Sequence, residues 1–243
     1  MTATRIAVPS ARAREVAATY SIRPGWVVLA AVAVVAVAVG GIPLTYQYAP
    51  LVVSVLALGL PHGAVDHLLI ARQRGEGLTV RWLGIVAGIY LVFGAAYGLV
   101  WFQFPVAAFV FFILLTWFHW GQGELYPLLD IVGAEYLRAP SQQALTVVVR
   151  GGAPMAVPLV AFLAQYEFVA TSLVGLFDPA AAEALAPVFT TEARAAVGVV
   201  YGLAVAATIG LGWVRTGSRD PWLVDTGEML GLTAFFLLVP PIL

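Results

Sequence analysis

Seven stretches of the chain are almost entirely apolar, and polar residues gather in the segments between them. A membrane-spanning helix needs about 20 consecutive, mostly apolar residues, and each of these stretches comes close to that length. The pattern therefore predicts an all-α, polytopic transmembrane helix bundle of about seven spans. The predicted spans are Trp26 to Leu44, Pro50 to Ala71, Trp82 to Phe102, Pro105 to Tyr126, Ala144 to Gln165, Ala195 to Trp213 and Leu223 to Leu243.

Two local features interrupt this regular pattern. The fifth predicted span contains helix-disrupting residues that are expected to kink it, namely Gly151, Gly152, Pro154 and Pro158. In the loop before the sixth span, Asp178 is followed directly by Pro179 and a run of alanines. An acidic N-cap followed by proline is typical of a helix start, so we expect a short extra helix there.

The chain divides into a polar start and an apolar remainder. Residues 1–24 carry four arginines against one glutamate, and the first apolar run begins too late for a typical cleaved signal peptide. We therefore expect a cytoplasmic N-terminal segment over residues 1–24 and a transmembrane helical domain over residues 25–243. The chain stops within an apolar run at Leu243, so we also expect this domain to be C-terminally incomplete.

Composition supports a membrane protein. Only 10% of the residues are charged and 61% are hydrophobic, whereas soluble domains carry about 25% charged residues. The net charge of −1 gives no reason to expect a nucleic-acid partner. The sequence has no cysteine, which excludes disulfides and iron–sulfur clusters, and no lysine, so all twelve cations are arginines.

The arginines predict an orientation. If the N-terminus is cytoplasmic, eleven of the twelve arginines fall in inner segments and only Arg194 falls outside. Cytoplasmic loops carry the excess of positive charge, so the sequence predicts a multi-pass protein of the cell membrane with a cytoplasmic N-terminus. The inner arginines are Arg5, Arg12, Arg14, Arg23, Arg72, Arg74, Arg81, Arg138, Arg150, Arg215 and Arg219.

All three histidines stand in or beside the apolar stretches. Ionisable groups at that depth are costly and usually face a protein interior with a function. His62 lies 12 residues after Pro50, and His119 lies 14 residues after Pro105, so both sit roughly 20 Å along their helices. Two imidazoles at matched depth on neighbouring helices can ligate one metal ion, which makes His62 and His119 the candidate metal ligands and catalytic residues.

Three further ionisable side chains accompany these histidines. Asp66 is four residues after His62 on the same helix face, where it could orient an imidazole. His67 lies about 140° around the helix from His62, so it is a poor partner in coordination and is better placed to pair near Arg72. Glu124 lies near the inner interface of the membrane. It could support the metal site, or it could be an ordinary solvated carboxylate.

Simpler interpretations exist for each of these features. A single histidine within a membrane helix often acts only as an interhelical hydrogen-bond donor. The aromatic residues of the fourth span fit lipid contact and packing, although an apolar aromatic lining also suits a long hydrophobic substrate. These residues are Phe109, Phe111, Phe112, Trp117, Phe118 and Trp120.

The two histidine blocks resemble a known family. Pro61-His62-Gly63-Ala64-Val65-Asp66-His67 and Phe118-His119-Trp120-Gly121-Gln122-Gly123-Glu124 are similar to motifs of the Brp/Blh family of membrane β-carotene 15,15′-dioxygenases, and Arg150 to Pro158 resembles the fifth helix of that family. The resemblance implies that Fe(2+) bound by histidines uses dioxygen to cleave β-carotene centrally into two retinals. It implies His62 and His119 as iron ligands, and matches Asp66 and Glu124 to the acids that follow them.

One family motif has no counterpart in this sequence. Family members continue into a helix with a His-Ser-x-Arg-His motif that supplies two more iron ligands, and nothing in the 243 residues matches it. We therefore expect the chain to be a catalytically incomplete part of a family member.

Other classes of membrane protein share some of these features. An opsin holds retinal through a lysine, which this sequence lacks. A transporter or carrier could use His62, Asp66 and His119 as a cation or proton relay, but matched pairs of broken helices would favour it, and only one clearly broken span is present. A non-catalytic membrane scaffold is the third interpretation.

Overall fold

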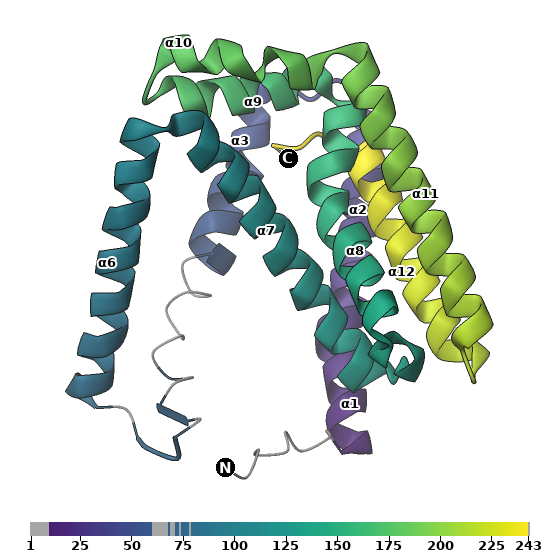
Figure 1. The fold of residues 1–243 in the computed structure, drawn as a ribbon. Helices are drawn as coiled ribbons and strands as arrows, with labels where there is room; N and C mark the ends of the chain where they lie inside the picture. The colour runs from purple at the N-terminus through teal and green to yellow at the C-terminus, as the bar shows by residue number, and fades with distance from the viewer. Residues whose placement is uncertain (1–9, 60–67, 69–70, 73, 78, 243) are drawn as a thin grey trace. The chain divides into compact units, whose positions relative to one another are not determined.

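The structure is a computed structural model that describes residues 10–59, 68, 71–72, 74–77 and 79–242 (Figure 1). Within these ranges the regular structure is entirely helical, which confirms the predicted all-α class. Five helical stretches of the described chain are long and apolar enough to cross a membrane: Ala11–Val39, Val80–Gln103, Pro105–Val132, Pro140–Ala161 and Thr191–Arg215. Each overlaps one of the seven predicted spans.

Most of the described residues lie in helices. In chain order they are α1 (Ala11–Ala17), α2 (Arg23–Val39), α3 (Leu44–Ser54), α6 (Val80–Gln103), α7 (Pro105–Pro127), α8 (Pro140–Ala161), α9 (Leu163–Gly175), α10 (Pro179–Ala182), α11 (Thr191–Arg215) and α12 (Arg219–Leu238). Wider π-helical turns follow α1, α3 and α7 at Ala18–Ile22, Val55–Gly59 and Leu128–Val132. Short 3-10 helices form Glu135–Arg138 and Glu183–Phe189.

The chain forms two compact units. The first unit comprises residues 1–40, 112–168 and 186–241, and the second comprises residues 41–111, 169–185 and 242–243. The division falls inside α7 and inside α9, so each of these helices contributes one part to each unit.

The first helix begins earlier than the sequence pattern predicts. The Ser10 side chain accepts a hydrogen bond from the Ala13 backbone at 3.2 Å, and the helix runs from there to Val39. Alanine and arginine are strong helix formers, so this polar stretch extends the apolar span towards the N-terminus. The helix ends at Gly40 and Gly41, whose positive φ angles of 59° and 39° suit glycine.

α8 is the central helix of the first unit. More than half of its most apolar stretch is buried (56%), against 17% or less in the other four long apolar helices. It packs against α11 and α12 (Figure 1), and polar side chains tie the helices together. Gln142 donates to the Thr208 carbonyl at 2.9 Å, and Arg194 donates to the Leu159 carbonyl at 3.2 Å.

The expected kink in the fifth span takes a different form. α8 continues as a helix through Gly151, Gly152 and Pro154, and it ends at Ala161, three residues after Pro158. Phe162 leaves the helical conformation (φ −127°, ψ 54°), and α9 begins at Leu163. The predicted span Ala144 to Gln165 is therefore interrupted near its end.

The short loop helix is confirmed. α10 has Pro179 as its first residue, and the Asp178 side chain accepts a hydrogen bond from the Ala180 backbone at 2.9 Å. An N-cap carboxylate satisfies a backbone donor that the first turn leaves without a partner.

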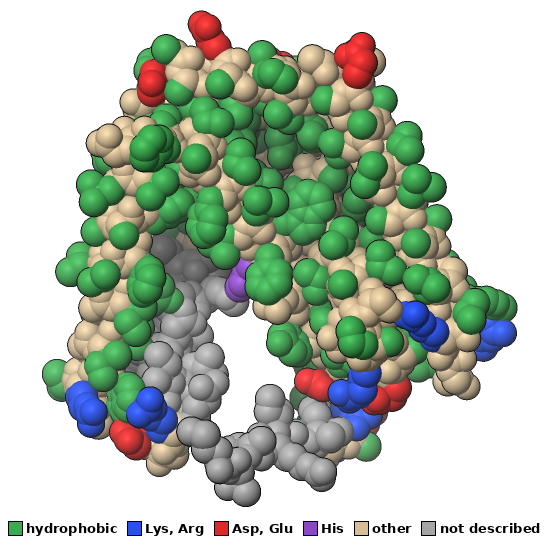
Figure 2. Space-filling model, in the orientation of Figure 1, with side chains coloured by type: hydrophobic (Ala, Val, Ile, Leu, Met, Phe, Trp, Pro, Cys, Tyr) green, Lys and Arg blue, Asp and Glu red, His purple; other side chains and the backbone are tan. Residues whose placement is uncertain are grey.

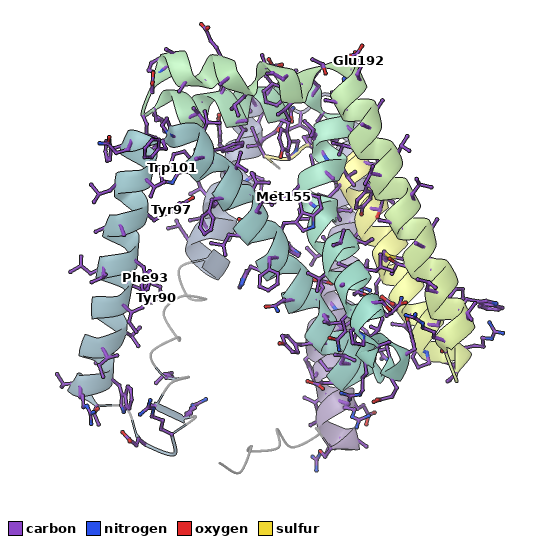
Figure 3. The ribbon with its side chains drawn as sticks, in the orientation of Figure 1. Tyr90, Phe93, Tyr97, Trp101, Met155 and Glu192 are labelled. Carbon is purple, nitrogen blue, oxygen red and sulfur yellow. The ribbon has the colours of Figure 1, made fainter. Side chains whose placement is uncertain are left out.

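The second unit contains an aromatic cluster on α6. Tyr90, Phe93, Tyr97 and Trp101 lie along one side of this helix (Figure 3). Tyr97 donates to the Ala108 carbonyl at 2.9 Å, and the Trp101 ring stacks on Phe177 with 5.0 Å between ring centroids. These contacts join α6 to the start of α7 and to the segment after α9.

Outward surfaces are strongly apolar. Figure 2 shows hydrophobic side chains along the visible lengths of α6 and α11, and valines and leucines of α11 such as Val200, Leu203 and Val214 are exposed. Charge on α11 is confined to its ends, with Glu192 in the first turn and Arg215 in the last. A helix with an apolar body and charged ends suits a bilayer.

Candidate functional site

His119 lies on α7, in the part of that helix that belongs to the first unit. Its side chain is exposed. The other predicted site residues, His62, Asp66 and His67, lie outside the described residues. The predicted convergence of His62 and His119 on one metal ion therefore stays a prediction.

α7 and α8 approach each other at the backbone level. A Cβ atom built on Gly121 would lie 2.2 Å from the Val147 carbonyl oxygen, and one built on Gly151 would lie 2.0 Å from the Trp117 carbonyl oxygen. Trp117 also donates its indole N–H to the Val148 carbonyl at 2.8 Å. Small residues commonly allow such close packing of membrane helices, so glycine is required at both crossing points.

This crossing determines which way His119 faces. Trp117 and Gly121 are one turn apart and both contact α8. His119 lies two residues from each, about 160° around the helix. Its side chain is therefore directed away from α8, which agrees with its exposure. Glu124 returns to the α8 side, within about 60° of Gly121.

Glu124 pairs with a buried arginine. Arg150 of α8 has a fully buried side chain, and its Nη1 atom lies 2.9 Å from Glu124 Oε2. Its Nη2 atom lies 2.7 Å from Asp225 Oδ1 and 3.3 Å from Glu228 Oε2, both on α12. We call these four residues the charge cluster. One guanidinium group thus joins α7, α8 and α12.

Two neutral donors complete the charge cluster. The Tyr136 hydroxyl donates to Asp225 Oδ2 at 2.5 Å, and the Trp26 indole donates to Glu228 Oε1 at 3.1 Å. Burial raises the pKa of the Tyr136 hydroxyl, and the Asp225 carboxylate raises it further. Tyr136 therefore keeps its proton and acts as a donor.

A second ion pair stands next to Tyr136 at the surface. Arg138 Nη2 lies 3.3 Å from Glu135 Oε1, and both side chains are exposed. Hydrogen bonding from Arg138 lowers the pKa of the Glu135 carboxyl. Exposed pairs of this kind contribute little to stability, unlike a buried ion pair that loses one of its partners.

Two cavities border the charge cluster. One of about 240 Å³ is lined by Glu124, Glu228 and Trp26 together with apolar side chains that include Leu29 and Leu128. A larger one of about 560 Å³ shares Trp26 and Glu228. Both cavities are mainly apolar. The charged groups that line them are Glu124 and Glu228 in the smaller cavity, and Arg23 and Glu228 in the larger one.

The described residues do not present a complete iron site. Within the described part of the chain, no group of three histidine, aspartate or glutamate side chains is arranged to hold a metal ion. The carboxylates of the charge cluster are engaged with Arg150. The described residues therefore do not fit the implied Fe(2+) by themselves, and no reaction step through iron follows from their geometry.

The sequence patterns did not identify the charge cluster. Arg150 was assigned to an inner segment, but it lies in the middle of α8 with its side chain buried. Asp225 and Glu228 belong to neither histidine block, although two acids three residues apart in an apolar stretch share a helix face. That spacing, combined with a lone arginine in another apolar stretch, is the signal that points to an intramembrane ion pair.

Comparison with known proteins gives a consistent result. The sequence model of the family described as "Beta-carotene 15,15′-dioxygenase" matches residues 53–243. The chain is 40% identical over 233 residues to the "Probable beta-carotene 15,15′-dioxygenase Blh" of Halobacterium salinarum, covering 96% of this chain and 67% of that protein. It is 33% identical over 202 residues to the "Probable beta-carotene 15,15′-dioxygenase Brp" of the same organism, covering 83% of this chain and 55% of that protein.

A third relative matches a smaller part. The "Beta-carotene 15,15′-dioxygenase" of an uncultured marine bacterium is 30% identical over 70 residues, which cover 29% of this chain and 26% of that protein. No solved structure matches the chain. The chain therefore spans about two thirds of the Blh protein and about half of the Brp protein.

Proposed function

Because the chain belongs to the beta-carotene 15,15′-dioxygenase family, we propose that the protein cleaves β-carotene with dioxygen at its central double bond and releases two retinals. The observation that carries this proposal is the extent of the relationship, 40% identity over 96% of the chain with a relative named for that reaction. The balance of the reaction is simple, because one double bond is broken and each carbon receives one oxygen atom of dioxygen.

We further propose that His62 and His119 are ligands of a ferrous ion and that Asp66 orients one of the imidazoles. This rests on the two histidine blocks and on the matched depths of the histidines along their predicted helices. A ferrous ion, when bound, would supply the activation of dioxygen. The contribution of the described chain is to present His119 on the side of α7 opposite α8.

The proposed setting is the cell membrane, with seven spans and a cytoplasmic N-terminus. Five long apolar helices support a membrane setting, and the positions of two arginines in the first unit agree with the proposed orientation. Arg215, at the end of α11, donates to Ser141 at the start of α8 at 2.9 Å, and Arg219 lies at the start of α12. In this setting β-carotene, which dissolves in lipid, would enter laterally from the bilayer.

Reporter fusions test the orientation. A reporter active only in the cytoplasm, fused after Arg74 in one protein and after Phe177 in another, is expected to be active at the first position and inactive at the second. The reason is that the arginine-rich loops of the proposed seven-span arrangement stay inside. Equal activity at the two positions would contradict the arrangement.

A membrane carrier is the second candidate function. The observation that favours it is the buried charge cluster, because ionisable groups within membrane helices often mark ion or proton pathways. In this alternative His62, Asp66 and His119 act as a relay and no carotenoid is cleaved.

Expression in a β-carotene-producing bacterium distinguishes the candidates. Two forms are compared, the present 243 residues and a form extended to the full length of the relatives. The extended form is expected to bleach the cells and to produce retinal, measured by chromatography of cell extracts. If the extended form accumulates in the membrane and produces no retinal, the oxygenase proposal is overturned and the carrier becomes the leading candidate.

A further inference from the structure

We propose that Arg150 and Glu124 are positioning residues for His119, and that the ion pair between them sets the depth and rotation of α7 against α8. The inference rests on the proposed role of His119 in the carotenoid-cleaving site. It concerns geometry alone, and all the residues that carry it belong to the first unit.

The contacts between α7 and α8 bracket His119 along the helix. Trp117 and Gly121 touch the α8 backbone just before and just after it, and Glu124 meets Arg150 five residues further on. Backbone contacts through glycines set the distance between two helices, and the Trp117 indole adds one neutral hydrogen bond to the Val148 carbonyl. The charge-assisted hydrogen bond of 2.9 Å at Glu124 is stronger than a neutral one and resists sliding or rotation of α7 against α8.

Arg150 is itself held in place. Its Nη2 atom is committed to α12 through the Asp225 carbonyl at 3.0 Å and the Asp225 carboxylate at 2.7 Å. Tyr136 and Trp26 in turn fix the carboxylates of Asp225 and Glu228. Because the guanidinium group is planar and rigid, holding Nη2 on α12 directs Nη1 towards Glu124.

The charge cluster contains two ion pairs whose effects can be separated. We call the pair of Arg150 with Glu124 the α7 arm and the pair of Arg150 with Asp225 the α12 arm. The α12 arm, Arg150 with Asp225, is almost completely buried, whereas the Glu124 side chain is one-third exposed (34%). Loss of the α12 arm is expected to destabilise the fold more than loss of the α7 arm. If the cluster also positions His119, loss of the α7 arm is expected to displace His119 more.

Thiol labelling, combined with unfolding measurements, tests whether the pair with the larger effect on stability has the smaller effect on the position of His119. The chain has no cysteine, so His119→Cys creates a single thiol at the position of interest. Its rate of modification by a maleimide is measured under native conditions in the full chain, alone and combined with Glu124→Ala, Glu124→Gln or Asp225→Ala. Unfolding midpoints are measured for the same proteins.

Glu124→Ala is expected to shift the labelling rate, and Glu124→Gln, which keeps an acceptor of the same length for Arg150, is expected to restore it. Asp225→Ala is expected to lower the unfolding midpoint further than Glu124→Ala while leaving the labelling rate of the folded protein near that of the parent. The reason is that the backbone carbonyl of residue 225 and the Glu228 carboxylate still hold the Nη2 atom of Arg150 on α12. If Asp225→Ala prevents folding, Tyr136→Phe replaces it, because that change removes the hydroxyl that holds Asp225.

The proposal is overturned if Glu124→Ala leaves the labelling rate unchanged, or if the Asp225 or Tyr136 variant shifts it equally. Neither substrate nor iron is present in this experiment. Its failure would therefore leave the carotenoid-cleaving function intact, and a failure to produce retinal would leave the positioning result intact.

Discussion

Replacing His119 with alanine in the extended form described above is expected to abolish retinal formation while the protein still accumulates in the membrane. Non-haem iron in oxygenases depends on a few histidine and carboxylate ligands around an open coordination position, and the loss of one proposed ligand would disrupt that arrangement. The protein should survive the change, because His119 is exposed and faces away from the α7–α8 contact.

His62→Ala is expected to have the same effect as His119→Ala. Asp66→Asn is expected to reduce retinal formation by about 10- to 100-fold, as is common when the group that orients a metal ligand is changed. Retinal per unit of membrane-bound protein and the iron content of the purified protein are the two measurements.

Leu114→Ala provides the matched control for the histidine variants. Leu114 is an exposed residue of the same helix, and its truncation should leave both retinal formation and iron content unchanged. Retinal formation at the parental level by His119→Ala would remove this residue from the proposed site.

Replacing Arg150 with leucine is expected to lower the free energy of unfolding by about 3–5 kcal/mol, the usual cost of leaving a buried charge without its partner. Asp225 and Glu228 would remain largely buried (side chains 4% and 14% exposed) without a counter-charge. Unfolding by denaturant in detergent micelles, followed by circular dichroism, provides the measurement.

Two comparisons identify the cause of this loss. Arg138→Leu removes a cation from an exposed pair and should change stability little. Combining Arg150→Leu with Asp225→Leu and Glu228→Leu removes the two more deeply buried of the three unpaired carboxylates. It should recover part of the lost stability, because apolar residues can replace buried ion pairs. Full stability of Arg150→Leu alone would show that the charge cluster does not hold these helices together.

Properties that depend on local composition and on short motifs could be predicted from the sequence. The apolar stretches indicated helices and a membrane setting, since a helix in lipid satisfies its own backbone groups and needs only about 20 apolar residues. Asp178 and Pro179 located α10, because a cap acts within the same turn. The two histidine blocks indicated the family that the comparisons then identified.

Helix boundaries were less predictable. The first helix extends through residues that look like a polar terminus, because helix propensity does not distinguish a membrane segment from its extension. Gly151 suggested a kink, yet its role in the structure is to admit the Trp117 backbone. A glycine permits both outcomes, and only the neighbouring helix decides between them.

The tertiary structure alone revealed the charge cluster. Glu124 and Asp225 are 26 and 75 positions from Arg150 along the chain, so no local spacing rule connects them. Their pairing depends on the crossing of α7 with α8 and on the packing of α12 against α8. A charge buried among helices must find a partner, but the identity of that partner follows from how the helices pack.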